Sequence, residues 1–151
     1  QRFGCIILGA PGSGKTTALR DMIRLFSERG YRVGVADERG EISGDGKFDL
    51  GPCSDVITGL SKAESAMLLL RGMNPQIIAM DEITQSADAD AIRELCCCGV
   101  ELLATAHARN ADELRQRRVF AELLDTGAFK YALSIRGAGS ARSYELEELH
   151  V

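Results

Sequence analysis

The sequence contains no apolar run long enough for a transmembrane helix, and it shows no signal peptide. It also lacks a strong excess of charge, because 18 lysines and arginines face 22 aspartates and glutamates, for a net charge of −4. This balance argues against bulk binding to nucleic acid or to an anionic membrane, so we expect no nucleic-acid partner. The 151 residues, 45% hydrophobic and 26% charged, have the size and composition of one globular domain.

Cysteine pairs at the spacing of zinc ligands are missing as well. The five cysteines are Cys5, Cys53 and the run Cys96-Cys97-Cys98, whereas a zinc site needs two separated pairs at C-x₂₋₄-C spacing. An odd number of cysteines without a signal peptide favours reduced thiols in a cytosol over a disulfide framework. We therefore interpret the triple run as small buried residues at a helix end before Gly99.

A complete phosphate-binding motif is present near the start of the chain. Gly9-Ala10-Pro11-Gly12-Ser13-Gly14-Lys15-Thr16 fits G-x-x-x-x-G-K-[ST], with an apolar strand pattern at 5–8 before it and a helical pattern at 17–26 after it. Lys15 would reach the β- and γ-phosphates, and the Thr16 hydroxyl would hold Mg²⁺. A glycine-rich turn with a chance lysine is the alternative. We assign nucleotide binding to Pro11, Gly12, Ser13, Gly14, Lys15, Thr16 and Thr17.

Strand and helix patterns alternate along the rest of the chain. Strands are expected at 31–37, 76–80, 101–106 and 130–135, with an edge strand at 143–149; helices are expected at 61–72, 88–98 and 111–125. Residues 38–59 are glycine-rich and charged, and we interpret them as an irregular loop. Several strands are continuous apolar runs, which predicts an α/β fold of three layers, with a mainly parallel sheet between helices.

Two adjacent carboxylates close the apolar strand at 76–80. Asp81 lies where P-loop enzymes carry the acidic residue of the Mg²⁺ shell. Transfer of a phosphoryl group to water needs a group that orients the water, and Glu82, beside the metal carboxylate, suits that role. An ordinary acidic pair at a strand end is the alternative reading of these two residues.

Glu38 is a second candidate for the water-orienting base. It follows the expected strand at 31–37, and glutamates at that position polarise water in some recombinase-like and rotary ATPases. A solvated loop charge is the alternative, and the choice between Glu82 and Glu38 stays open.

His107 follows the strand at 101–106 and enters the same edge of the sheet. Because histidine donates and accepts hydrogen bonds near neutral pH, we assign it a phosphate-side or subunit-interface role that reports loss of the γ-phosphate; a satisfied structural histidine is the alternative. The catalytic set is therefore Glu82, Glu38, Lys15 and His107. Three arginines are candidates to contact phosphate in cis or in trans: Arg39, Arg71 and Arg109.

Four motifs in order carry a family resemblance: Gly-Ala-Pro-Gly-Ser-Gly-Lys-Thr-Thr, Val-Gly-Val-Ala-Asp-Glu-Arg-Gly-Glu-Ile, Met-Asn-Pro-Gln-Ile-Ile-Ala-Met-Asp-Glu-Ile and Ala-Thr-Ala-His-Ala. Together they resemble the C-terminal ATPase domain of the stage III sporulation protein AA family, which is similar to type II, type IV and pilus secretion ATPases. In those terms, 37–41 matches the acidic box, 81–82 the Walker B motif and 105–107 the histidine box.

The resemblance implies a recombinase-like (ASCE) P-loop core in which the strand at 101–106 lies between those at 5–8 and 76–80. It further implies ATP or ADP with Mg²⁺ as cofactors and a homo-hexameric ring. That ring would lie in the cytoplasm, peripheral at the inner face of a bacterial membrane on the mother-cell side. There it would energise a membrane-embedded channel or platform protein of the sporulation export apparatus. Since the chain begins at Gln1 without an initiator methionine, we expect 1–151 to be one domain, with the family's N-terminal domain absent.

Three alternative functions remain to be separated from this one. Leu60-Ser61-Lys62-Ala63-Glu64 mimics the signature of an ABC transporter ATPase, but Lys62 and Ala63 replace the glycines that would face phosphate. The short distance from the P-loop also leaves no room for the helical subdomain of that class. A small-molecule kinase is the second alternative, and the Asp-Glu pair speaks against it. The third is a nucleotide-dependent assembly switch with little turnover.

Overall fold

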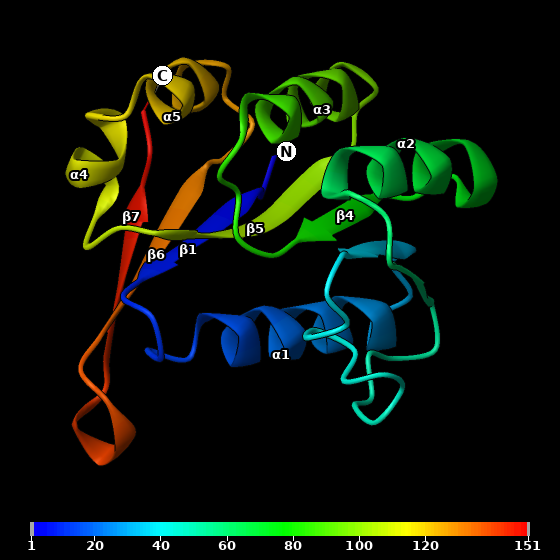
Figure 1. The fold of residues 1–151 in the computed structure, drawn as a ribbon, viewed down its shortest axis with the longest axis horizontal. Helices are drawn as coiled ribbons and strands as arrows, with labels where there is room; N and C mark the ends of the chain where they lie inside the picture. Colours follow the sequence, from blue (N-terminus) through cyan, green and yellow to red (C-terminus); the bar gives the residue numbers. More distant parts are fainter. Residues whose placement is uncertain (1, 151) are drawn as a thin grey trace.

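The computed structural model describes residues 2–150 as one seven-stranded sheet with helices on both faces (Figure 1). The strands pair in the order β3-β2-β4-β5-β1-β6-β7, and only the β6–β7 pair is antiparallel. Strand β5 thus lies between β1 and β4, as the family resemblance implies. Within residues 2–150, no helix has the length and apolarity needed to cross a membrane. The strands are β1 (Cys5–Gly9), β2 (Val33–Asp37), β3 (Ser54–Thr58), β4 (Ile77–Met80), β5 (Glu101–His107), β6 (Tyr131–Arg136) and β7 (Ser143–Glu148).

Two hydrophobic cores form because successive strand residues point to opposite faces of the sheet. From β1, Ile6 and Leu8 pack into one core, and Cys5 and Ile7 pack into the other. Helix α1 (Lys15–Glu28) alone covers the second face, and the remaining helices cover the first (Figure 1). The prediction of three layers is therefore confirmed. The helices of the first face are α2 (Lys62–Met73), α3 (Ser86–Cys97), α4 (Ala111–Arg115) and α5 (Arg118–Asp125).

Side-chain caps start two of these helices where the sequence predicts them. The Ser61 hydroxyl accepts a hydrogen bond from the Glu64 backbone N–H at 3.2 Å, which opens α2. Asn110 accepts one from the Glu113 N–H at 2.9 Å and opens α4. Such caps satisfy backbone donors that have no partner inside the helix.

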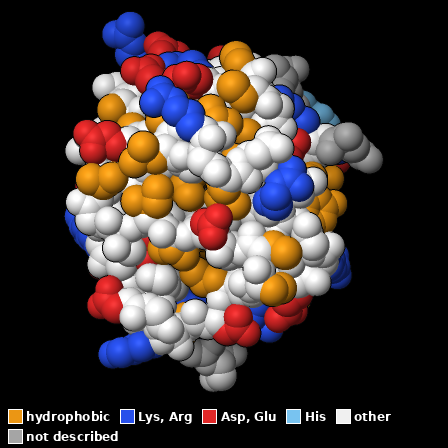
Figure 2. Space-filling model, turned by 90° about the vertical axis from the view of Figure 1, so that its right-hand side faces the viewer, with side chains coloured by type: hydrophobic (Ala, Val, Ile, Leu, Met, Phe, Trp, Pro, Cys, Tyr) orange, Lys and Arg blue, Asp and Glu red, His pale blue; other side chains and the backbone are white. Residues whose placement is uncertain are grey.

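The expectation of an irregular loop at 38–59 is wrong for residues 54–58, which form β3 and pair in parallel with β2. This edge strand has no continuous apolar run: Ile57 is half-buried against the core, while Val56 is 38% exposed. A sequence of mixed polarity on a sheet edge therefore hides the strand from pattern analysis. The side of the molecule formed by α2, β3 and the preceding loop carries apolar side chains between charged ones (Figure 2).

The cysteine run marks a helix end as predicted, but the expected burial is wrong. Helix α3 ends at Cys97, and Cys97 and Cys98 are exposed, while Cys96 is half-buried. The buried stripe of the last turns passes through Ile92 and Leu95, so residues 97 and 98 fall on the solvent side of a 3.6-residue period. All five cysteines are free, and no group of three or more potential metal-ligating side chains occurs within residues 2–150.

Candidate functional site

The loop between β1 and α1 forms a cradle of backbone N–H groups at the carboxyl edge of the sheet. Gly12 and Gly14 adopt left-handed conformations, with φ of 78° and 99°, which a residue with a Cβ rarely tolerates. The Ser13 N–H donates to the Ala10 carbonyl at 3.1 Å and closes the turn. A Cβ on Gly9 would lie 2.3 Å from the Ser13 hydroxyl, so this position also requires glycine. Helix α1 begins directly after Gly14, so its first N–H groups, which have no partner inside the helix, and its positive dipole end lie at this loop.

Lys15 lies across this cradle and connects it to β5. Its ammonium donates to the Ala10 carbonyl at 3.0 Å and lies 3.1 Å from Nδ1 of His107. A protonated lysine can only donate, so Nδ1 accepts, and Nε2 carries the proton of a neutral His107. That Nε2 lies 3.2 Å from Oε1 of Glu82. Burial lowers the pKa of Lys15, and the carboxylates of Glu82 and Asp81 oppose the shift.

Asp81 and Glu82 are held in place from the neighbouring strand. The Thr16 hydroxyl donates to Asp81 Oδ2 at 3.0 Å, and the Thr105 hydroxyl donates to Oδ1 at 2.6 Å. The same Thr105 oxygen accepts the Glu82 backbone N–H at 2.8 Å, where Glu82 has a positive φ of 50°. The hydroxyl and carboxylate oxygens of Thr16 and Asp81 are hard ligands of the kind Mg²⁺ prefers. The donor set of these two residues therefore fits this ion.

A cavity of about 480 Å³ contains most of the predicted site. Glu82 and His107 reach it beside Lys15, whereas Glu38 does not line it. Two residues without an assigned role, Glu41 and Arg142, also line it. No sequence motif points to Arg142, because only the pairing of β6 with β7 brings it beside the loop between β1 and α1. The lining consists of Pro11, Gly12, Gly14, Lys15, Thr16, Thr17, Glu41, Glu82, His107 and Arg142.

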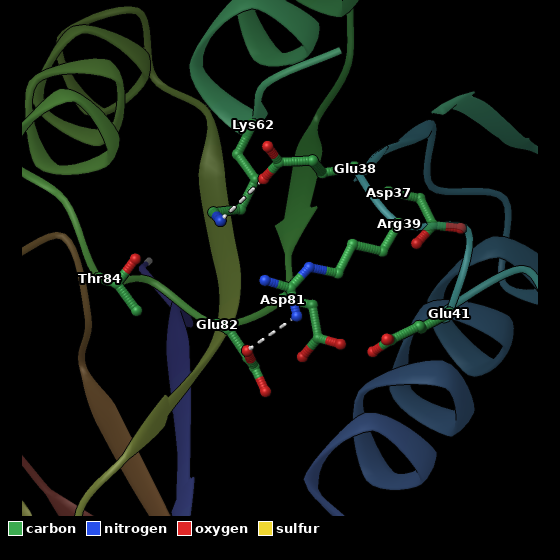
Figure 3. A pocket seen from close by; sticks show the side chains of 8 residues that line it. All are labelled: Asp37, Glu38, Arg39, Glu41, Lys62, Asp81, Glu82 and Thr84. Carbon is green, nitrogen blue, oxygen red and sulfur yellow. Dashed lines mark hydrogen bonds and ion pairs between the residues drawn. The ribbon is translucent and has the colours of Figure 1, made fainter. Parts of the chain in front are cut away.

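Glu38 lies on a separate, smaller cleft of about 70 Å³ that also reaches Asp81 and Glu82 (Figure 3). Its carboxylate pairs with the Lys62 ammonium at 3.2 Å, and neither residue lines the Lys15 cavity. Glu82 instead has Arg39 at 4.0 Å. The geometry thus brings Glu82, and not Glu38, to Lys15 and His107.

The remaining predicted residues, Asp37, Arg109 and Arg71, do not line the Lys15 cavity. Asp37 is buried and accepts hydrogen bonds from the Ile42 N–H, the Ser43 N–H and the Ser43 hydroxyl at 2.7–3.0 Å, so it holds the following loop. Arg109 lines a cavity of about 500 Å³ on the other flank of residues 9–13. Arg71 lines a hollow along α2 and is not brought to the loop.

Solved structures similar to this chain are secretion and pilus ATPases. The VirB11 ATPase of the Brucella suis type IV secretion system, in complex with sulphate, superposes with a TM-score of 0.74 at 16% identity, over 97% of this chain and 48% of VirB11. The pilus retraction motor PilT with bound ADP gives a TM-score of 0.73 at 20% identity, over 100% of this chain and 49% of PilT. At such identities the likeness establishes the fold alone, a three-layer α/β architecture with a P-loop.

Sequence relatives narrow this further. Stage III sporulation protein AA of Bacillus subtilis is 34% identical over 142 residues, which are 88% of this chain and 46% of the relative. The uncharacterized protein ycf45 of the alga Porphyra purpurea is 32% identical over 137 residues, 87% of this chain and 24% of the relative. The chain thus spans less than half the length of these relatives. The family described as "Sporulation stage III, protein AA" matches residues 1–143, and the chain belongs to that family.

Proposed function

We propose that residues 1–151 form the ATPase domain of a longer protein and hydrolyse Mg²⁺-ATP to ADP and phosphate. One observation supports this above the others: Thr16–Asp81 and Lys15–His107–Glu82 form two contact chains around one cavity. The first chain supplies ligands for a metal, and the second connects a phosphate-binding cation to a carboxylate. An ordinary acidic strand end would need neither.

In this proposal the phosphates are held by residues 12–17, where the Ser13 N–H already donates to the Ala10 carbonyl and the other N–H groups are the candidate donors. Lys15 exchanges the Ala10 carbonyl for a phosphate oxygen, since an anion stabilises its charge better than a neutral carbonyl does. Thr16 and Asp81 would hold Mg²⁺, which neutralises charge on the β- and γ-phosphates when bound. The fit of loop, lysine and hydroxyl to a polyphosphate supports a nucleoside triphosphate as substrate, and the similarity to ATPases supports ATP.

Glu82 is the proposed base. Its carboxylate orients a water and accepts its proton while the water oxygen bonds to the γ-phosphorus. The bond between that phosphorus and the β–γ bridging oxygen breaks, and ADP leaves with the electron pair. His107, between Glu82 and Lys15, would sense the loss of the γ-phosphate. Glu38, which lines the neighbouring cleft together with Glu82, stays a second candidate.

For the whole protein we propose a homo-hexameric ring at the inner face of a bacterial membrane, with a further domain preceding residue 1. It would energise a membrane-embedded channel or platform protein of the sporulation export apparatus. Similarity to a type IV secretion ATPase and to a pilus motor supports the ring, and the Bacillus subtilis relative supports the sporulation setting. The algal relative has no sporulation in its name, so the reaction is the part to test first.

The test is steady-state ATP hydrolysis by this chain and by the full-length protein, each beside Glu82→Gln and Glu38→Gln. Glu147→Gln, an exposed carboxylate on β7, is the matched control. We expect Glu82→Gln to bind ATP but lose turnover by about a hundredfold or more, the usual contribution of a general base. We expect Glu147→Gln to match the wild type.

Several results would contradict the proposal. Wild-type turnover in Glu82→Gln would remove the assigned base, and normal ATP affinity and rate in Lys15→Ala would remove the assigned site. ATP binding without hydrolysis in both the chain and the full-length protein would favour the assembly switch. Phosphorylation of an added small acceptor would favour the kinase.

A further inference from the structure

Arg142 reaches the phosphate loop from the opposite end of the sequence. It follows the turn between β6 and β7, which projects from the same side of the molecule as the loop leading into α1 (Figure 1). A Cβ placed on Gly14 would lie 3.1 Å from the guanidinium carbon of Arg142 and 3.2 Å from one of its terminal nitrogens. The guanidinium therefore packs directly on the backbone of the motif, on the wall of the cavity that Lys15 lines.

The β6–β7 turn fixes this position. Gly137 has φ of 79°, and a Cβ there would lie 2.6 Å from the Ala141 carbonyl, so the chain reverses tightly. A short 3₁₀ turn, Gly139–Ala141, follows, and the Arg142 N–H donates to the Gly139 carbonyl at 3.3 Å. Since Ser143 pairs with Arg136 in the β6–β7 ladder, Arg142 lies immediately beyond the last rung.

Arg142 differs from the other cations of this hairpin in having no acidic partner. Arg136 pairs with Glu145 at 3.4 Å, and Lys130 pairs with Glu148 at 3.8 Å. Among residues 2–150, no ion pair involves Arg142, and its Nε is buried without a hydrogen-bond partner. A buried guanidinium donor without a partner is costly, and an anion in the adjoining cavity would satisfy it.

We propose that Arg142 binds the phosphate chain of the nucleotide in cis; this inference rests on the proposed function of the same cavity. A guanidinium presents several N–H donors in one plane and can contact two phosphate oxygens at once. With Lys15 and the N-terminus of α1, it would surround the phosphates with positive charge from three directions. The arginines singled out by sequence, Arg39, Arg71 and Arg109, do not line this cavity.

The experiment compares Arg142→Ala and Arg142→Lys with the wild type. Lys130→Ala is the matched control, because it removes a cation from the same hairpin away from the loop. Isothermal titration measures affinity for ATP and for pyrophosphate, and thermal unfolding is followed without nucleotide. We expect Arg142→Ala to weaken both ligands by about ten- to a hundredfold, the loss that one charge-assisted contact gives. Arg142→Lys should recover part of this, and Lys130→Ala should bind as the wild type does.

The outcomes separate this inference from the proposed function. If the wild type binds neither ATP nor pyrophosphate, the proposed function fails and the inference fails with it. If the wild type binds both and Arg142→Ala binds them equally well, only the inference is overturned. A structural role would instead lower the unfolding temperature of Arg142→Ala without nucleotide below the wild-type value, which would also overturn it. The inference requires that temperature to equal or exceed the wild-type value, because an unpartnered buried donor is removed.

Discussion

Replacement of Thr105 by valine tests whether one hydroxyl holds both strand-end carboxylates. Thr105 is fully buried, and its hydroxyl donates to Asp81 at 2.6 Å while accepting the Glu82 N–H at 2.8 Å. Valine has nearly the same shape, so the change removes these two hydrogen bonds and creates almost no cavity. Any loss of stability then reports the hydroxyl itself.

The expected loss combines two terms. Leaving the Glu82 N–H without a partner costs about 1–3 kcal/mol, and the bond to the charged Asp81 contributes about 1.5–3 kcal/mol. Because Asp81 keeps its contact with Thr16 at 3.0 Å, we expect a total of about 2–4 kcal/mol rather than the full sum. For a chain of this length, that loss lowers the unfolding temperature by about 4–16 °C.

Urea and thermal unfolding followed by circular dichroism measure this difference. Thr58→Val is the control, since Thr58 is exposed at the end of the edge strand β3 and valine suits a strand. Thr105→Ser keeps the hydroxyl and should retain most of the stability that valine loses. A surface substitution usually changes the free energy of unfolding by no more than about 0.5 kcal/mol. If Thr105→Val differs from the wild type by no more than this, the role given to the Thr105 hydroxyl is refuted.

Three further predictions follow from burial and charge. Asp37→Asn should lower the free energy of unfolding by about 2–3 kcal/mol in urea, because the carboxylate accepts three hydrogen bonds from residues 42 and 43; an unchanged urea midpoint would contradict this. Iodoacetamide at pH about 8 should alkylate Cys97 and Cys98 but not Cys5, since burial raises the pKa of Cys5 to about 12; peptide mass mapping decides. Burial lowers the pKa of Lys15 from 10.5, so the unfolded state binds more protons, and wild-type stability relative to Lys15→Met should rise as the pH approaches that value; a parallel pH profile would refute the shift.

The sequence predicts the fold well where a local pattern coincides with burial. The runs at 5–8, 76–80 and 101–106 lie in strands whose two faces are both covered, and every side chain there except those of Gln76, Glu101 and Thr105 is apolar. Strand β3 is missed by sequence analysis because its residues are of mixed polarity, and only its pairing with β2 makes it a strand. The exposure of Cys97 and Cys98 is missed for a related reason, because small apolar residues suit either side of a helix end. Which side they take is set by the buried positions Ile92 and Leu95 in the preceding turns.

At the site, sequence patterns single out residues that lie within a motif and miss residues that only strand pairing brings to the cavity. The loop, Asp81 and His107 converge because parallel strands end at one edge of the sheet. Asp37 lies at the same edge, yet its carboxylate accepts hydrogen bonds from the loop that follows it. Arg142 lies far from any motif and depends on the register of β6 with β7. Such positions require the complete sheet before they can be found.

The contacts of Lys15 suggest how binding and sensing would be coupled in the proposed ATPase. Lys15 occupies Nδ1 of His107 at 3.1 Å, and Nε2 of the same ring faces Glu82 at 3.2 Å. A phosphate that draws the ammonium away leaves Nδ1 without its donor, so the ring is free to rotate. Rotation changes the contact with Glu82, the proposed base. Binding of the phosphate would therefore change the position of the Glu82 carboxylate through the His107 side chain alone. For this reason His107→Phe should alter turnover more than nucleotide affinity.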